Sequence, residues 1–389
     1  MVSKIKQKFR ERKFASMKKM LIAGNANSIY LLDYIRYTLD DLNFEVFVPC
    51  FGQVSKDYLA EYDKLNVELI PLQNHGSTFG KYLAILKFIF FRLGGRIDFL
   101  NIQYVPSGRY LYFLSILQLL FARKSGLSFW GSDILRIGEK QAHKLESLLK
   151  RCKAISLPTI EMRKKFQVFY GQKYDSKIIA GCYFGSPIFS AIQEQSFDKL
   201  AAKKRLGLPT NKTIVHIGYS GAKAQQHLPV IEQLAELPPT VKQQLFIQIH
   251  LGYALESPEY CRQIQDALDR SRIEHELILD FLDRPGMATF RLAADVFIHA
   301  QTTDAMSSTI REYLFARAAL FNPVWIPYPE FKKLGVDYLE YHNFSEIKDG
   351  LIAYLSGNLT IDFTNNQNLM FNNYSWEKAK AAWQSFVNG

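Results

Sequence analysis

Residues 295–322 read DVFIHAQTTDAMSSTIREYLFARAALFN: an apolar strand-like run, a polar turn, a helical segment and a second apolar run. A strand, a helix and a further strand in this order form a parallel pair joined by a right-handed crossover. The same alternation of short apolar runs and helix-length segments continues in both directions along the chain. It predicts an α/β protein whose parallel sheets are covered by helices on both faces.

Towards the N-terminus, the alternation predicts a doubly wound domain over residues 18–185. A helix is expected at 29–42, and helix-length segments separate the later strands. The expected strands are KMLIAG at 19–24, FEVFV at 44–48, VELIPL at 67–72, IDFLNIQY at 97–104, GLSFW at 126–130 and AISLP at 154–158. Each run is rich in the aliphatic and aromatic residues that strands favour.

A second doubly wound domain is expected over residues 186–374, after the alternation breaks down at 181–204. Its expected strands lie at 212–218, 244–252, 275–281, 295–300 and 319–322. The last segment, 375–389, is helical and is expected to return to the first domain. Two Rossmann-like domains in tandem should face a cleft with the carboxyl ends of their strands, where such sheets bind ligands.

Composition narrows the class of protein. The 389 residues are 48% hydrophobic, which excludes a disordered or collagen-like chain and suits two domains. The 48 Lys and Arg residues outnumber the 37 Asp and Glu residues and give a net charge of +11, which favours an anionic partner. No nucleic-acid partner is expected, because charge alone would support one and no recognised nucleic-acid motif is present.

Part of the positive charge lies in a basic tail at residues 1–17. Residues 1–19 carry eight basic side chains and one acidic side chain. Two interpretations stay open: a disordered, solvated tail, or an anchor on an anionic membrane surface in which Ile5, Phe9 and Phe14 contact lipid. No apolar region with a cleavage site follows, so the segment is not a secretory signal.

Two apolar runs, at 82–91 and 110–122, are too short to cross a bilayer. They predict core helices or, alternatively, a face that contacts a membrane. The cysteines lie far apart at Cys50, Cys152, Cys182 and Cys261, so they indicate neither a zinc site nor a disulfide framework. A cytoplasmic protein, associated with the inner face of the cell membrane in the anchor interpretation, is expected.

Glycine-containing loops follow the first strand of each domain. The loop GNANS at 24–28 lacks the G-x-G-x-x-G spacing, which argues against a dinucleotide cofactor. In the second domain, Gly218, Ser220, Gly221 and Lys223 stand between a strand and a helix, where amides, a hydroxyl and an ammonium group can meet phosphate oxygens. The alternative is that these glycines only form a turn.

The helix start within 301–320 is the strongest candidate site. Its hydroxyl side chains are Ser307, Ser308 and Thr309. Exposed amides there would bind a diphosphate, with Asp304 and Glu312 placed for sugar hydroxyls. The alternative is a capping box between Thr309 and Glu312 that only starts the helix.

Asp304 and Glu312 are separated by seven residues, and this element resembles the E-x7-E element of GT-B glycosyltransferases, with Asp in place of the first Glu. The resemblance implies that Glu312 holds the ribose hydroxyls of a nucleotide sugar and that Asp304 contacts the transferred sugar. Segments 218–227, 250–264 and 129–135 are similar to those of the enterobacterial 4-acetamidofucosyl transferases. A nucleotide-diphosphate sugar donor and a lipid-linked or surface-polysaccharide acceptor are therefore expected.

Further candidates stand at other strand ends. Asp133 follows the strand at 126–130 and is expected to orient an acceptor hydroxyl or act as a base, or else to cap a short helix. His250, Gly252 and Tyr253 follow a strand of the second domain and are expected to contact the nucleotide. The alternative for His250 is a strand-end histidine with no ligand.

The sequence shows no spacing of His, Cys and acidic residues typical of a metal site, so metal-independent transfer is expected. Lys223, the amides near Gly221 and the helix start at 307–309 would then stabilise the leaving diphosphate. The E-x7-E-like element favours retention of anomeric configuration by resemblance. No other cofactor is expected.

Two alternatives belong to other functional classes. A catalytically silent GT-B subunit that binds a saccharide or a partner transferase would bind nucleotide without transferring sugar. A sugar-nucleotide epimerase would convert its substrate with no acceptor present. The sequence carries no signal for the oligomeric state.

Overall fold

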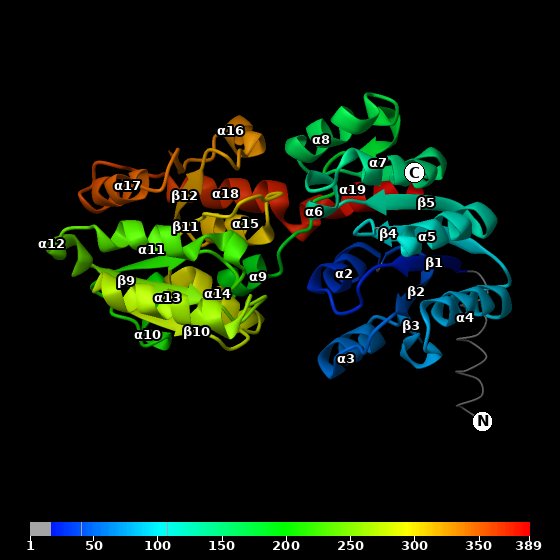
Figure 1. Cartoon of the computed structure of the whole chain (residues 1–389), viewed down its shortest axis with the longest axis horizontal. Helices are drawn as coiled ribbons and strands as arrows, with labels where there is room; N and C mark the ends of the chain where they lie inside the picture. The colour runs from blue at the N-terminus through cyan, green and yellow to red at the C-terminus, as the bar shows by residue number, and fades with distance from the viewer. Residues whose placement is uncertain (1–16, 40, 107) are drawn as a thin grey trace. The chain divides into compact units, whose positions relative to one another are not determined.

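The computed structural model describes residues 17–39, 41–106 and 108–389 (Figure 1). The expected basic tail at 1–17 and the membrane anchor at 1–19 lie almost wholly outside the described residues. The chain divides into two compact units. Unit 1 comprises the described residues up to Phe184 together with Trp376–Gly389, and unit 2 comprises Gly185–Ser375.

The sheet of unit 1 contains seven parallel strands in the order β3-β2-β1-β4-β5-β6-β7. The strands are β1 (Lys18–Ala23), β2 (Phe44–Cys50), β3 (Glu68–Pro71), β4 (Ile97–Gln103), β5 (Ala122–Ser128), β6 (Ala154–Ser156) and β7 (Ile178–Ile179). The doubly wound prediction is therefore confirmed. β5 begins at Ala122, before the expected run at 126–130. The sequence did not indicate this earlier start, because Arg123 and Lys124 interrupt the apolar pattern. β7, which has two residues, was not expected.

Helices cover both faces of this sheet. They are α2 (Ile29–Tyr34) with its π-helical extension η1 (Ile35–Leu39), α3 (Lys56–Lys64), η2 (Gln73–His75), α4 (Thr78–Phe91), α5 (Arg109–Leu120), α6 (Ser132–Leu135), α7 (Glu139–Arg151), α8 (Ile160–Tyr170), η3 (Asp175–Lys177) and α19 (Trp376–Asn388). The side chains of Ser55, Ser77 and Thr159 accept hydrogen bonds from N–H groups of the first turn and so begin α3, α4 and α8.

Helices α4 and α5 correspond to the apolar runs at 82–91 and 110–122. Ile85 and Ile89 of α4 and Leu114 and Leu117 of α5 are buried, so the core-helix prediction is correct for one face of each helix. The opposite faces also carry exposed apolar side chains. Of the helices in the described part of the chain, none is both long enough and apolar enough to span a membrane.

Unit 2 contains a second parallel sheet, of six strands in the order β10-β9-β8-β11-β12-β13. The strands are β8 (Thr213–Ile217), β9 (Leu245–His250), β10 (Glu274–Ile278), β11 (Val296–Ile298), β12 (Ala319–Pro323) and β13 (Leu339–Tyr341). The expected strands are present. The edge strand β13 was missed because it has only three residues and is mostly half-buried.

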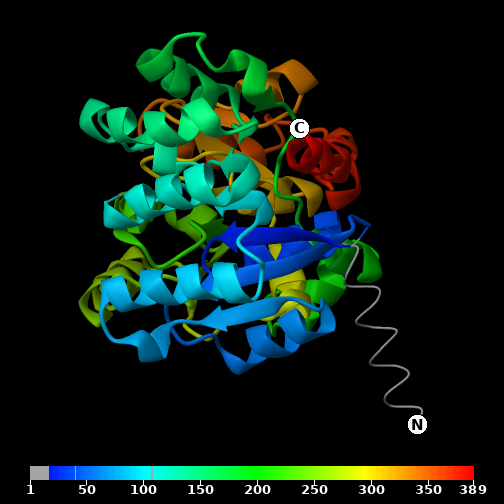
Figure 2. The same ribbon diagram turned by 90° about the vertical axis from the view of Figure 1, so that its right-hand side faces the viewer.

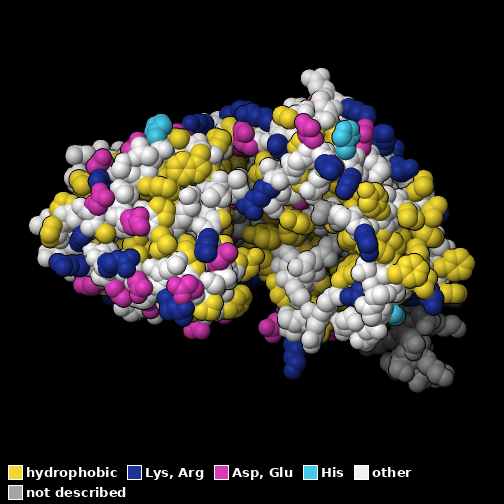
Figure 3. Space-filling view, viewed as in Figure 1, with side chains coloured by type: hydrophobic (Ala, Val, Ile, Leu, Met, Phe, Trp, Pro, Cys, Tyr) yellow, Lys and Arg dark blue, Asp and Glu magenta, His cyan; other side chains and the backbone are white. Residues whose placement is uncertain are grey.

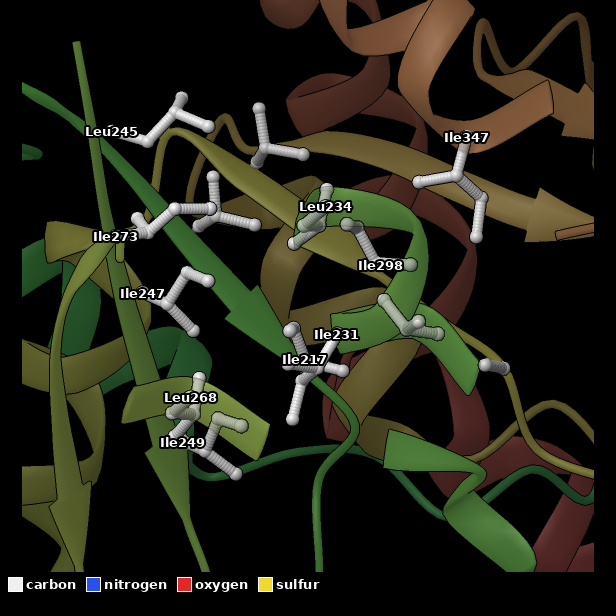
Figure 4. Close-up of a cluster of buried hydrophobic side chains, with 14 of the residues drawn as sticks. Ile217, Ile231, Leu234, Leu245, Ile247, Ile249, Leu268, Ile273, Ile298 and Ile347 are labelled. Atoms are coloured by element: carbon white, nitrogen blue, oxygen red, sulfur yellow. The ribbon is translucent and has the colours of Figure 1, made fainter. Parts of the chain in front are cut away.

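The helices of unit 2 follow the expected alternation. They are α9 (Ile188–Glu194), α10 (Lys199–Arg205), η4 (Lys223–Gln225), α11 (His227–Ala235), α12 (Pro239–Lys242), α13 (Pro258–Ser271), α14 (Arg284–Ala293), α15 (Ser308–Phe315), α16 (Pro329–Leu334), α17 (Glu346–Leu355) and α18 (Phe363–Tyr374). Aliphatic side chains of β8, β9 and β11 form a core with α11 and α13, as Figure 4 shows for Ile217, Ile249, Ile231 and Leu268. Strands buried on both faces explain the continuous apolar runs in the sequence.

The final helix, α19, packs on unit 1. Trp383 is fully buried, and its indole Nε1 donates to the carbonyl of Tyr183 at 2.8 Å. Phe386 is also fully buried and lies against Gly126 of β5, where a Cβ atom would stand 2.5 Å from the phenyl ring. Figure 2 shows α19 in red on one side of the unit 1 strands and the blue and cyan helices α4 and α5 on the other.

The contact between Gly126 and Phe386 predicts that even a methyl group at position 126 destabilises the fold. Gly126→Ala should lower the free energy of unfolding by about 1–3 kcal/mol, because the enclosed phenyl ring has to move. Gly138→Ala is the matched control in unit 1, since its added Cβ would contact nothing within 4 Å. Chemical denaturation of both variants tests this, and equal stabilities would contradict the packing described.

Candidate functional site

The strand order of unit 2 reverses between β8 and β11. From β8 the chain moves outward to β9 and β10, and then returns to place β11 on the other side of β8. The loops that follow these two strands therefore diverge at the carboxyl edge of the sheet. In doubly wound sheets, loops that diverge in this way border the crevice in which ligands bind. The loop at 218–226 and the loop at 299–307 are the two loops at this point.

Gly218 has a backbone conformation that suits glycine. Its φ is +63°, and a Cβ atom would lie 2.7 Å from Nε2 of His227. The next residues fold back onto Gln225, whose Oε1 accepts from the N–H of Tyr219 and whose Nε2 donates to Oγ of Ser220. Ser220 is buried, and its hydroxyl stabilises the loop through this hydrogen bond to Gln225.

The loop after β9 is hydrogen-bonded to the loop after β8. The N–H of Gly221 donates to the carbonyl of Tyr253 at 2.8 Å, and the N–H of Glu256 donates to the carbonyl of Gly221 at 3.0 Å. At Gly252 a Cβ atom would lie 2.2 Å from the carbonyl oxygen of Asp280. The structure thus brings Gly221, Gly252 and Tyr253 together, and Tyr253 is largely exposed.

Lys223 begins the short helix η4 next to these loops. Its side chain is exposed, and its ammonium group lies 5.9 Å from the ring centroid of Tyr260. A cation over an aromatic ring is stabilised modestly when it remains in water. Lys223 therefore places its ammonium group at the surface beside the loops.

His250 ends β9. Its Nε2 lies 3.0 Å from the carbonyl oxygen of Asp280, so Nε2 carries the proton and donates. Burial lowers the pKa of His250. The hydrogen bond to the carbonyl of Asp280 acts in the opposite direction, and the charge of Arg291 lowers the pKa further. Its Nδ1 is buried and has no hydrogen-bond partner among the described residues. Contact with a nucleotide stays a prediction for this nitrogen.

The carboxylate of Asp304 joins three segments around the crevice. The hydroxyl of Tyr219 donates to Oδ1 at 3.0 Å, and the hydroxyl of Tyr328 donates to Oδ2 at 2.7 Å. The N–H of Ser307 also donates to Oδ2, at 2.8 Å. Burial, followed by the charge of Asp304, raises the pKa of both tyrosines, so both hydroxyls stay protonated and donate.

The same contacts define the start of α15. Ser307 is its N-cap residue by position, its own side chain makes no capping bond, and Ser308 and Thr309 lie in the first turn. The capping-box alternative is wrong, because Thr309 lies inside the helix and Glu312 bonds elsewhere. Asp304 instead binds the N–H of Ser307 from outside the helix.

Glu312 is buried and paired. Its Oε1 accepts from the hydroxyl of Ser186 at 2.7 Å, and its Oε2 lies 3.3 Å from Nε of Arg291. Arg291 also donates to the hydroxyl of Tyr313 at 2.7 Å, and this hydroxyl lies 2.8 Å from Nδ1 of His216. Glu312 thus belongs to a buried hydrogen-bonded chain that runs from Ser186 to His216 on β8.

Sequence reasoning missed Ser186, Arg291 and Tyr328. Arg291 lies in α14 among buried apolar residues, and Ser186 is 126 positions from its partner in the chain. No local pattern indicates such contacts. His216 is fully buried, and both its ring nitrogens are hydrogen-bonded.

Asp133 belongs to unit 1 and is buried there. Its Oδ1 accepts from the N–H groups of Trp130 and Gly131, and its Oδ2 accepts from the N–H of Val105, all at 2.9 Å. Burial raises the pKa of Asp133 to about 6, although the backbone hydrogen bonds act in the opposite direction. The carboxylate connects the loops after β4 and β5, and its contact with an acceptor stays a prediction.

Within the described ranges, no group of three or more His, Cys, Asp or Glu side chains is placed to hold a metal ion. The four cysteines are free thiols. The chemical groups at the unit 2 crevice are therefore hydroxyls, backbone amides, imidazoles, carboxylates and the Lys223 ammonium.

Neither a protein-family model nor a curated protein sequence matches the chain. Solved structures do match. HepE (Alr3699) of Anabaena, crystallised with UDP and glucose, has a TM-score of 0.72 at 14% identity, with 95% of this chain and 99% of HepE covered. A glycosyltransferase from Rickettsia africae has a TM-score of 0.72 at 12% identity, with 96% of this chain and all of the other chain covered.

A third similar structure is WaaG, a glycosyltransferase involved in lipopolysaccharide biosynthesis, with a TM-score of 0.63 at 12% identity over 95% of this chain and 100% of WaaG. At these identities the likeness shows the fold alone. The fold is that of GT-B glycosyltransferases, with two Rossmann-like domains. The similarity to 4-acetamidofucosyl transferases stays a prediction.

The contacts of Asp304 predict that the effect of its substitution on stability depends strongly on Tyr219 and Tyr328. Asp304→Ala should cost about 2–5 kcal/mol of unfolding free energy, because two buried hydroxyls and a helix N–H lose their acceptor. In a Tyr219→Phe/Tyr328→Phe background the same change should cost at least about 1 kcal/mol less. Denaturation of the four proteins measures the coupling, with the exposed Asp266→Ala as control. Additive effects would contradict the shared hydrogen bonding.

Proposed function

We propose that the chain is a nucleotide-sugar-dependent glycosyltransferase that transfers a sugar from a nucleotide diphosphate to a lipid-linked or surface-polysaccharide acceptor. One observation carries this proposal: the loops at 218–226 and 299–307 meet at the switch point of unit 2, joined by the hydrogen bond between Tyr219 and Asp304. The fold is shared with HepE, whose crystals hold UDP with glucose or UDP-glucose.

The diphosphate of the donor binds at the start of α15 in this proposal. Ser308 and Thr309 lie in the first helical turn, where N–H groups and the helix dipole attract anions. Lys223 adds a positive charge from the loop after β8. Gly218, Ser220 and Gly221 act by shaping that loop, since the N–H of Gly221 already donates to Tyr253. These groups provide charge stabilisation without a metal.

Glu312 binds the ribose hydroxyls of the donor in this proposal. Its pairing with Arg291 fixes the orientation of the carboxylate, while each oxygen retains a further lone pair. Asp304 is proposed to contact the transferred sugar through its remaining lone pair at Oδ1. The E-x7-E-like spacing supports a retaining reaction.

A second candidate function is a silent GT-B subunit that binds nucleotide or saccharide without transfer. A specific observation favours it: the carboxylates of Asp133 and Asp304, the expected catalytic residues, each accept three hydrogen bonds from the protein. Nucleotide binding without release of sugar from UDP-glucose, in the presence of cell-envelope lipid extract, would support this candidate over the transferase.

The donor site predicts nucleotide binding. Calorimetry with UDP, TDP and GDP should show one ligand that binds, and Glu312→Gln should weaken it at least about tenfold, the loss expected for one charged hydrogen bond. Glutamine retains the size of the side chain and can still bond Ser186 and Arg291, so the fold should survive. The exposed Glu232→Gln of α11 is the matched control. Absence of binding to all three nucleotides would overturn the proposal.

We also propose that the protein associates with the inner face of the cell membrane, through residues 1–19 and through α4 and α5. Figure 3 shows hydrophobic side chains gathered over these two helices at the right-hand end. The exposed apolar side chains there are Phe79, Leu83, Phe90 and Phe91 of α4 and Tyr112, Ile116, Leu119 and Leu120 of α5. The rings of Tyr82 and Phe113 stack at 4.2 Å and hold the helices together. Exposed Lys87 and Arg96 suit anionic lipid.

The membrane proposal predicts that one charge on this face weakens lipid binding. Phe91→Glu should reduce sedimentation with vesicles containing phosphatidylglycerol at least about tenfold, because burying the carboxylate in the interface is costly. Phe281→Glu in unit 2 is a matched control, since Phe281 is 80% exposed and Phe91 is 81% exposed. Removal of residues 1–16 tests the tail separately. Equal effects of the two glutamates would contradict a specific face.

A further inference from the structure

Unit 1 has a switch point of its own. The strand order reverses between β1 and β4, so the segments after these strands, at 24–28 and 104–106, diverge at the carboxyl edge of the sheet. Aromatic side chains gather at this edge and form what we call the aromatic platform. Its members are Tyr30, Tyr104, Trp130 and Phe184.

Tyr104 is strained and exposed at the same time. It follows β4 with φ at +59°, a conformation that a bulky side chain adopts only at a cost, and it is 46% exposed. Its ring lies 5.8 Å from Trp130 in an edge-to-face contact, and its hydroxyl lies 3.1 Å from Oγ of Ser132. The structure thus presents this aromatic ring at the surface in a backbone conformation that costs energy.

Hydrogen bonds to Gln103 and Asp133 hold the aromatic platform in place. The indole Nε1 of Trp130 donates to Oε1 of Gln103 at 3.0 Å, so the indole cannot rotate freely. Asp133 binds the N–H of Trp130 and the N–H of Val105, which adjoins Tyr104 in the chain. One buried carboxylate thus connects the two loops that carry Tyr104 and Trp130. Asp133 is a positioning residue here, because it is buried and both its oxygens face the backbone.

We propose that the aromatic platform is a saccharide-binding subsite in which a sugar ring of the acceptor lies against Tyr104 and Trp130. A pyranose ring has an apolar face of C–H groups, which suits an aromatic surface, and a rim of hydroxyls, which suits nearby polar groups. Ser132 and the exposed Asn25 supply such groups at the same edge. This inference rests on the proposed function, which calls for a saccharide acceptor.

The test is saturation-transfer NMR on the full chain with methyl α- and β-glycosides of glucose, galactose, mannose and N-acetylglucosamine as probes. At least one probe should receive saturation mainly on the C–H groups of one ring face. Tyr104→Ala should reduce the signal about tenfold, as expected when a stacking partner is lost. Tyr112→Ala is the matched control, being a 51% exposed tyrosine of unit 1.

A second variant separates binding from structure. Tyr104→Gly removes the ring and suits the positive φ, so it should reduce saturation transfer as much as Tyr104→Ala does while leaving the thermal midpoint equal or higher. A lower midpoint would assign Tyr104 a structural role and overturn the proposal. Absence of transfer to every probe would overturn it too, as would loss of vesicle binding in Tyr104→Ala, which would assign the platform to lipid. Calorimetry with UDP on the same samples shows independently whether the donor site exists.

Discussion

The carboxylate of Asp304 is the interaction on which the unit 2 crevice depends. It accepts hydrogen bonds from the loop after β8, from the N-terminus of α15 and from the residue before α16, through Tyr219, Ser307 and Tyr328. These groups come from segments that share no strand. Because a buried phenol without an acceptor is costly, the three segments adopt their positions together. One short acidic side chain therefore connects the three segments that border the crevice.

Glu312 differs from Asp304 because its carboxylate is held by a buried ion pair. A buried ion pair gains little net stability, since desolvation of both charges offsets their attraction. Its pairing with Arg291 is part of a hydrogen-bonded chain that passes through Tyr313 and His216 to Gln248. The chain fixes α14, α15 and the sheet relative to one another. A donor that bound Glu312 would thus contact a group whose orientation is determined well inside the domain.

The sequence predicted the sheets well because buried parallel strands read as continuous apolar runs. It also located the loops at 218–226 and 299–307, because ligand loops follow the carboxyl ends of strands. The short edge strands β7 and β13 contain too few residues to show a pattern. The partners of Glu312 and Asp304 could not be predicted either. Ser186, Arg291 and Tyr328 are distant from them in sequence, and the residues around each form no motif. Asp133 was singled out, but its bonds to three backbone groups depend on how two loops fold.

The position of α19 has a consequence for biosynthesis. Trp383 bonds a carbonyl 200 positions earlier in the chain, and Phe386 fills the space above Gly126. A ribosome makes all strands of unit 1 first, then the whole of unit 2, and only afterwards the helix that covers the first sheet. The continuous unit 2 has all its residues while the first sheet still exposes an apolar surface. Synthesis of unit 1 thus begins before that of unit 2 and is completed after it, and the sheet of unit 1 exposes an aggregation-prone apolar surface until α19 has been made.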